Sequence, residues 1–296
     1  WFGHLLWRLF KYVLRLVTRR GELQRILGHP TASTATTTRL HAYLDQSRQL
    51  ASIATIVNGD KAFDETKLAA KALAIKGLPA NPTSSTASLS TTYTVANLKL
   101  CLGHLSHAAA ARGAIEKLRA TPYDSTDQAH ERRLEQLWTG LQDGKREGKD
   151  GGRYSTDWSR IGFQGRDPAT DFRGMGLLGL LNLHHLATVH RRDARSMLAT
   201  SKVKGHWFSF AIGGINVTGD LFHLLAAHQI ARYFYLCKDT QAQLLKFNQI
   251  YAGIFYEFVA YWKMRKANVM MFNTVKQDFF ELATPKLIAS TWKSSI

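Results

Sequence analysis

Residues 158–183 bring together the side chains of this chain that are best suited to chemistry. The run reads WSRIGFQGRDPATDFRGMGLLGLLNL, and it places Arg173 among two carboxylates and several glycines. An arginine guanidinium is always charged and presents its donors in a planar fork, so it can bind the oxygens of an anionic group such as a phosphoryl group. Arg173 is therefore the first candidate for a functional side chain.

The residues just before Arg173 should determine where it lies. Thr170 or Asp171 is a natural N-cap for a helix that runs to about residue 190, which would put Arg173 in the first turn. The helix dipole disfavours a cation there by a few tenths of a kcal/mol or more, so local structure alone would not select arginine. A purely structural role competes: an ion pair with Asp171 or Asp167 would lock the turn.

The other residues of the run are expected to support this turn. Three glycines would allow a helix or a bound surface to approach closely, and three aromatic residues are expected in the core. They are Gly174, Gly176 and Gly179, and Trp158, Phe163 and Phe172. Pro168 should fix the turn before the cap. Gln164 should orient Arg173, and the alternative is that its side chain bonds to backbone.

The elements that must position this run are helices. Apolar residues recur at helical spacing over residues 39–57, 61–76, 95–119, 125–141, 206–236, 241–266 and 268–290. Residues 78–94 are rich in proline, serine and threonine, and residues 143–153 are rich in glycine and charge, so both predict loops. Few segments resemble strands, and we predict an all-α, multi-helix domain over residues 29–296.

An arm precedes this domain, at residues 1–28. Its first twenty residues place His4, Arg8, Lys11, Arg15 and Arg19 on one narrow stripe of a helix whose remaining surface is apolar. Such a helix suits the headgroup region of an anionic membrane or a partner surface. The residues predicted to dock are Trp1, Phe2, Leu5, Leu6, Trp7, Arg8, Leu9, Phe10, Lys11 and Arg15. Packing on the domain, or a role as a mitochondrial presequence, are the alternatives.

The overall charge indicates an anionic partner. The chain has 39 basic and 22 acidic residues, a net charge of +17. Such a field attracts anionic membranes, acidic protein surfaces or nucleic acid, but no nucleic-acid-binding fold is evident and none is expected as a partner. No stretch is long and apolar enough to span a bilayer.

The sequence holds no pattern for a metal or cofactor site. The twelve histidines are scattered, and HExxH, CxxC and GxSxG are absent. Residues 144–149 (GKREGK) lack the spacing of a phosphate-binding loop, so we expect no bound nucleotide, cofactor or metal. Cys101 and Cys237 lie in apolar helical surroundings and are expected to be reduced core thiols in an intracellular compartment.

The run 158–183 closely resembles the signature of the ELMO (engulfment and cell motility) domain. The matching positions are Trp158, Gly162, Phe163, Gln164, Pro168, Thr170, Asp171, Phe172, Arg173, Gly174, Gly176, Leu180 and Leu183. Residues 22–26 (ELQRI), 121–125 (TPYDS) and 208–218 (FSFAIGGINVT) also resemble segments of the short members of this family. The resemblance thus extends over nearly the whole chain.

The resemblance implies a function. The short members are GTPase-activating proteins for ARF and ARF-like small GTPases, and the motif arginine is their proposed arginine finger, which corresponds here to Arg173. It also implies a peripheral location on endomembranes, lipid droplets or mitochondria. The alternative is a non-catalytic scaffold or accessory subunit of a larger membrane assembly, for example a mitochondrial one. An exposed Arg173 would favour the first reading, and an Arg173 locked in a salt bridge would favour the second.

Overall fold

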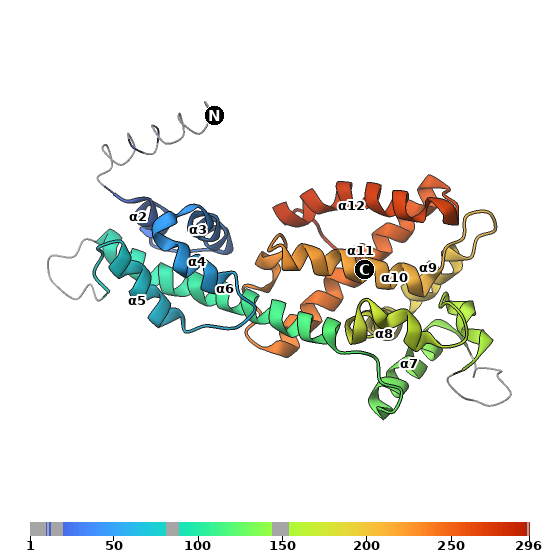
Figure 1. Ribbon diagram of the computed structural model, residues 1–296. Coiled ribbons are helices and arrows are strands. Elements are labelled where there is room, and N and C mark those ends of the chain that lie inside the picture. The colour runs from blue at the N-terminus through green and yellow to red at the C-terminus, as the bar shows by residue number, and fades with distance from the viewer. Residues whose placement is uncertain (1–9, 11, 13–19, 81–88, 144–153, 295) are drawn as a thin grey trace. The chain divides into compact units, whose positions relative to one another are not determined.

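The computed structural model describes residues 10, 12, 20–80, 89–143, 154–294 and 296, and this described part consists of helices and loops without a strand (Figure 1). The predicted all-α fold is confirmed. None of the helices that are described is long and apolar enough to cross a membrane. Of the predicted docking residues in the arm, Phe10 alone is described: it is helical and exposed, and the others lie outside the described residues.

The chain falls into two compact units, which are treated separately here. Unit 1 comprises Trp1–Ala111 and Ala231–Asp239, and unit 2 comprises Arg112–Ile230 and Thr240–Ile296. The long helix α6 (Leu89–Ala120) contributes residues to both. The predicted division into an arm (1–28) and a domain (29–296) stays a prediction.

Unit 1 consists of short helices and the first part of α6. They are α2 (Glu22–Leu27), α3 (Thr34–Gln46), η1 (Arg48–Leu50), α4 (Ala51–Val57), α5 (Glu65–Ile75) and η4 (Ala231–Phe234). The prediction of one helix over residues 39–57 is wrong in two ways. The helix begins earlier because the Ser33 hydroxyl caps it, accepting a hydrogen bond from the backbone N–H of Thr36 at 3.3 Å, and the chain leaves the helix at Ser47.

The predicted core face of α6 is confirmed. Its members are all buried: Leu98, Cys101, Leu102, Leu105 and Ala109. The helix starts at Leu89, within the segment that was predicted as a loop to residue 94. Its threonines are compatible with a helix because a hydroxyl can bond within it: Thr94 Oγ1 donates to the carbonyl of Ser90 at 2.7 Å.

Unit 2 carries the motif and the longest helices that follow α6. Its elements are α7 (Gln128–Leu141), η2 (Thr156–Ile161), η3 (Pro168–Arg173), α8 (Gly176–Val189), α9 (Arg191–Ser201), α10 (Phe210–Ala226), α11 (Thr240–Arg265), η5 (Val269–Met271) and α12 (Phe272–Ala289). The predicted helix 206–236 is too long at both ends, since α10 ends at Ala226 and His228 adopts a left-handed φ of 62°. Helix α9 had no counterpart in the prediction.

Helix α8 lies at the centre of unit 2, between α7, α10 and α11 (Figure 1). Its apolar residues surround the whole helix, as in a helix that is covered on all sides. Glycines allow two of these contacts. A Cβ on Gly140 would lie 2.5 Å from the carbonyl oxygen of Ala187, and one on Gly214 would lie 2.6 Å from Leu183 Cδ2. The backbones of α7 and α8 therefore touch directly.

Both cysteines are buried and neither is in a disulfide, as predicted for core thiols. Burial raises the pKa of the Cys101 thiol above its usual value. A raised pKa keeps the thiol protonated and therefore unreactive.

The first residue of α8 requires glycine. Gly176 has a φ of +49°, and a Cβ there would lie 2.3 Å from the carbonyl oxygen of Thr121. The next backbone N–H, of Leu177, donates to that same carbonyl at 2.9 Å, so the start of α8 is held against the end of α6. Gly174, two residues earlier, has a φ of −80° and open space around its Cα.

The two glycines thus form a matched pair for a stability test. We expect Gly176→Ala to lower the free energy of unfolding by about 2–4 kcal/mol, because alanine is strained at that φ and its Cβ overlaps backbone. Gly174→Ala should change it by less than about 1 kcal/mol, since its backbone conformation suits any residue. Urea unfolding followed by circular dichroism measures both. Equal effects would show that the close contact at Gly176 does not form.

Candidate functional site

The motif folds as a loop of two short 3-10 helices, η2 and η3, between α7 and α8. The loop is closed at its base, where the backbone N–H of Ser155 donates to the carbonyl of Arg166 at 3.0 Å. The Ser155 hydroxyl then caps η2 by accepting from the N–H of Asp157 at 3.1 Å. These bonds give the loop a fixed shape before Arg173 is reached.

Aromatic rings form the base of the loop. Trp138 of α7 meets Trp158 edge-on at 5.7 Å between ring centroids, and Trp158 meets Phe163 at 5.9 Å. Phe163 meets Phe172 at 5.5 Å, and Phe172 stacks on Tyr123 at 5.6 Å. Trp158, Phe163 and Phe172 are buried, which confirms their predicted place in the core. The backbone that leads into Arg173 is thereby anchored in apolar contacts.

Gly162 fixes the loop to the start of α10. Its φ is +86°, and a Cβ there would lie 2.2 Å from the backbone nitrogen of Phe210. Its carbonyl accepts a hydrogen bond from the N–H of Ile212 at 3.2 Å. Only glycine allows this approach, so the glycine of the GFQ triplet has a definite structural reason.

Asp171 ties the two halves of the loop together. Its Oδ2 accepts a hydrogen bond from the backbone N–H of Gln164 at 2.8 Å. Burial raises the pKa of the Asp171 carboxyl above its usual value, and the nearby Asp167 adds to this. The bond from Gln164 and the charge of Arg173 act in the opposite direction. The contact runs through the backbone of Gln164, and the orienting role predicted for its side chain stays a prediction.

Arg173 lies on the surface of the loop. Its Nε donates to the carbonyl of Thr170 at 2.8 Å, and its side chain is exposed. Within the part of the chain that the structure describes, it forms no ion pair, and its two terminal nitrogens form no hydrogen bond. The ion pair with Asp171 or Asp167, on which the alternative structural role depends, is therefore not formed. The stem is held while the end of the fork faces outward.

The predicted N-cap for this region is wrong. Asp167, not Thr170 or Asp171, is the cap: its carboxylate accepts from the N–H of Ala169 at 3.0 Å and starts η3. Proline at the first position of η3 favours this start, since its φ is already helical. Arg173 consequently ends a 3-10 helix instead of beginning α8. A cation is not disfavoured at the end of a helix, so the dipole argument from sequence does not hold.

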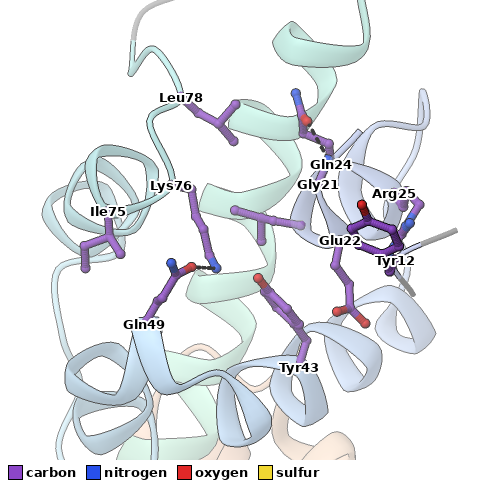
Figure 2. Close-up of a pocket in the computed structure, with 11 residues that line it drawn as sticks. Tyr12, Gly21, Glu22, Gln24, Arg25, Tyr43, Gln49, Ile75, Lys76 and Leu78 are labelled. Carbon is purple, nitrogen blue, oxygen red and sulfur yellow. Dashed lines mark hydrogen bonds between the residues drawn. The ribbon is translucent and has the colours of Figure 1, made fainter. Parts of the chain in front are cut away.

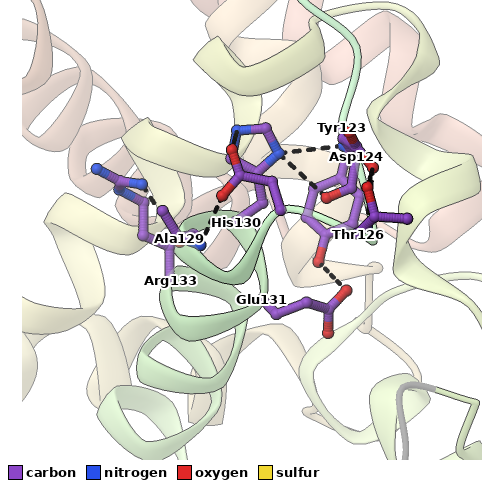
Figure 3. A network of polar contacts seen from close by, with 8 residues as sticks. Tyr123, Asp124, Thr126, Ala129, His130, Glu131 and Arg133 are labelled. Carbon is purple, nitrogen blue, oxygen red and sulfur yellow. Dashed lines mark hydrogen bonds and ion pairs between the residues drawn. The ribbon is translucent and has the colours of Figure 1, made fainter.

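A network of polar contacts lies beside the loop, in the segment that leads into α7 (Figure 3). The hydroxyl of Tyr123 donates to Glu131 Oε1 at 2.7 Å. The N–H of Asp124 donates to His130 Nδ1 at 3.1 Å. Because Tyr123 also stacks on Phe172, this network supports the loop from below. The sequence drew attention to residues 121–125 (TPYDS) only through their resemblance to other proteins. The contacts with Glu131 and His130 are seen only in the structure.

A hollow of about 550 Å³ lies in unit 1, between α2, α3 and the end of α5 (Figure 2). Its lining is mainly polar, and Lys76 Nζ donates to Gln49 Oε1 at 2.6 Å across part of it. The same ammonium lies 5.5 Å from the centre of the Tyr43 ring. None of the motif residues lines this hollow.

No group of three metal-ligating side chains occurs among the described residues. Three histidines contact protein groups through their ring nitrogens. His104 Nδ1 lies 2.8 Å from Thr37 Oγ1, His107 Nδ1 lies 2.8 Å from the carbonyl of Tyr235, and His184 Nε2 lies 2.8 Å from Gln136 Oε1.

Comparison with known proteins identifies a family and several relatives. The ELMO/CED-12 family model matches residues 113–276, which include the whole motif loop. ELMO domain-containing protein B of Dictyostelium discoideum is 35% identical over 276 residues, 93% of this chain and 92% of that protein. ELMO domain-containing protein 1 of Pongo abelii is 32% identical over 293 residues, 93% of this chain and 86% of that protein. The human ELMO domain-containing protein 2 is 35% identical over 185 residues, 62% of each chain.

The chain therefore belongs to the ELMO/CED-12 family, as the motif indicated. Its relatives are similar along most of its length, and the match is not confined to the signature.

The half-buried carboxylate of Asp171 gives a pH-dependent prediction. Because its pKa is raised in the folded state, ionisation above the ordinary aspartate value of 3.8 lowers the stability of the fold. Asp171→Asn removes this charge but retains an oxygen for the N–H of Gln164. As the pH rises from about 4 to about 6, the free energy of unfolding of the unaltered chain should fall relative to that of the variant.

Urea unfolding across this pH range measures the effect. Asp60→Asn, at an exposed position, is the control for losing a carboxylate. A difference that stays constant with pH would show that Asp171 is not buried in its charged form.

Proposed function

We propose that this protein is a GTPase-activating protein for ARF-family small GTPases, and that Arg173 enters the nucleotide site of the partner. The supporting observation is the exposed guanidinium of Arg173, whose two terminal nitrogens form no hydrogen bond with any residue that the structure describes. An arginine in a permanent ion pair would have to break that pair first. Membership of the ELMO/CED-12 family is the second support, since the motif is the family signature.

The chemistry needs a positive, forked donor at a fixed place. Negative charge develops on the oxygens of the transferred phosphoryl group, and an arginine supplied by a partner can raise the rate by about 10³–10⁵. The benefit depends on pre-organisation, because a mobile side chain must lose entropy at the moment of reaction. The bond from Arg173 Nε to the carbonyl of Thr170 supplies part of that order.

The rest of the loop acts as a rigid support. Asp171 bonds the backbone of Gln164 across the loop, and Gly162 is held against α10. The buried rings of Phe163 and Phe172, one from each half of the loop, pack against each other. In this proposal Asp171 and Gln164 are positioning residues, and Arg173 alone reaches the reacting phosphoryl group. The GTPase provides the nucleotide and the attacking water.

We expect acceleration of GTP hydrolysis by about 10²-fold or more when this protein is added to its cognate ARF or ARF-like GTPase. Arg173→Lys should abolish it, since lysine retains the charge but loses the fork. Single-turnover hydrolysis by a panel of purified GTPases, in solution and on vesicles, is the measurement. Arg166→Lys is the matched control, because Arg166 is exposed in the same loop and contributes its backbone carbonyl to the fold.

A full effect in the Arg173→Lys chain would rule out the arginine finger. Absence of any acceleration across the panel would instead favour the scaffold, a subunit that uses the same helical domain to hold a membrane assembly.

The location follows from the same proposal. ARF-type partners would be met on the surface of endomembranes, lipid droplets or mitochondria, and the arm at residues 1–28 would hold the protein there as a peripheral, intracellular membrane protein. The sequence of the arm supports this through its wide apolar face and its cationic stripe.

The arm proposal has its own test. Replacing Trp7 and Phe10 together by glutamate should lower binding to anionic vesicles at least about ten-fold, because both aromatic anchors are lost and like charge is added. Leu282→Glu, at an exposed position of α12, is the control. Vesicle sedimentation measures the bound fraction, and unchanged binding would mean that the arm packs elsewhere.

A further inference from the structure

Two loops of unit 2 lie side by side and expose an unusual set of side chains. One connects α9 to α10 and the other connects α11 to α12, and Figure 1 shows both at the same end of this unit. Residues 202–209 and 263–271 are called the two-loop tip below. Its exposed apolar side chains are Val203, Trp207, Met264, Met270 and Met271.

Contacts beneath the tip hold the two loops together. Trp262 Nε1 donates to the carbonyl of His206 at 2.7 Å, and His206 Nδ1 lies 3.3 Å from the carbonyl of Ala267. The ring of Phe208 packs on Trp262 at 5.0 Å and on Phe272 at 5.9 Å. The tip is therefore a built surface with an aromatic base.

Neighbouring residues of the first loop point in opposite directions. Phe208 is buried in this base, whereas Trp207 is 48% exposed. In the second loop Met270 is 89% exposed, the highest value among the exposed large apolar side chains of the described chain. These side chains are thus available to a partner, and the fold beneath does not need them.

Charge on the tip has one sign. No aspartate or glutamate occurs between Asp193 and Asp220, or between Glu257 and Asp278. Lysines and an arginine alternate with the apolar residues instead: Lys202, Lys204, Lys263, Arg265 and Lys266. The next acidic residue along the chain, Asp278, is paired with Arg265 at 3.1 Å, and the lysines named are all exposed.

We propose that the two-loop tip inserts into the surface of an anionic membrane, as a contact separate from the N-terminal arm. Tryptophan and methionine would enter the interfacial region, and the lysine ammonium groups would remain at the phosphate level. Each lysine near an anionic surface strengthens binding about five-fold. The proposal does not depend on GTPase activation.

The pattern favours a lipid surface over a protein partner. A stable protein interface buries about 800 Å² on each side and has a continuous apolar centre with few charges. On the tip Val203 and Met264 each lie between two basic residues, in Lys202-Val203-Lys204 and Lys263-Met264-Arg265. Lipid accepts such an arrangement, because side chains insert one by one and long cationic stems reach back to the headgroups.

The contact would also orient the motif. The tip ends at Ser209, and the next residue is Phe210. The backbone nitrogen of Phe210 faces Gly162 of the motif loop. Partial desolvation of its ammonium group lowers the pKa of Lys202, and the positive charge of Arg160 in the motif loop lowers it further. A membrane-bound tip would therefore hold the motif loop close to the membrane.

A fluorescent reporter tests the proposal on the full chain. Both native cysteines are buried, so a thiol-reactive, environment-sensitive dye on a Met270→Cys chain labels the tip. Vesicles of phosphatidylcholine with phosphatidylserine should shift its emission to the blue and raise it at least about two-fold, and phosphatidylcholine alone should do so far less. Leu282→Cys, exposed on α12 away from the tip, is the matched control and should not respond.

Charge reversal supplies the second arm. Lys204→Glu with Lys263→Glu, in the chain labelled at position 270, should weaken the response at least about ten-fold without changing the urea unfolding curve. A silent label at position 270 on a chain that sediments with anionic vesicles would overturn the proposal and leave the arm as the membrane contact. Absence of vesicle binding by the full chain would overturn it as well. Neither result requires a GTPase, so both are separate from the failure of the arginine finger.

Discussion

The row of rings from Trp138 through Trp158 and Phe163 to Phe172 is the contact on which the motif loop depends. These four side chains come from α7, η2, the turn after it and η3, and each meets the next edge-on at 5.5–5.9 Å. Aromatic pairs of this kind contribute about 0.5–1.5 kcal/mol each beyond their buried area. A loop of two 3-10 helices has few backbone bonds of its own, so these ring contacts add to the hydrogen bonds that hold it.

Two glycines allow the backbone at the ends of this loop to approach neighbouring backbone closely. Gly162 faces the backbone of Phe210, and Gly176 faces the backbone of Thr121, both with a positive φ. These two contacts bracket the segment that carries Arg173, because one lies before it and one after it. The guanidinium is therefore exposed on a segment whose two ends are fixed, which is the arrangement an arginine needs to act on a partner.

Unit 2 thus combines an exposed arginine on a rigid loop with a basic tip formed by two other loops. The motif loop and the tip are both connected to α10. The first turn of α10 contacts Gly162, and the loop that precedes α10 contains Trp207. The two features have different chemistry: one presents a forked donor for phosphoryl oxygens, and the other alternates lysine with exposed apolar side chains. Together they fit a protein that meets an anionic partner at a membrane surface, as proposed above.

The sequence by itself determined the all-α class, the core face of α6, the buried aromatic residues of the motif and the family, because helical periodicity and a long motif are local signals. It predicted the wrong N-cap for the helix that contains Arg173 and the wrong limits for α10, and it did not predict α9. Those features depend on contacts between distant segments: Asp167 caps η3 within a loop held by Trp158 and Gly162. Whether Arg173 pairs with a carboxylate was likewise open in the sequence. The tertiary structure decided it: Asp171 accepts the N–H of Gln164, Arg173 Nε donates to the carbonyl of Thr170, and the guanidinium is exposed.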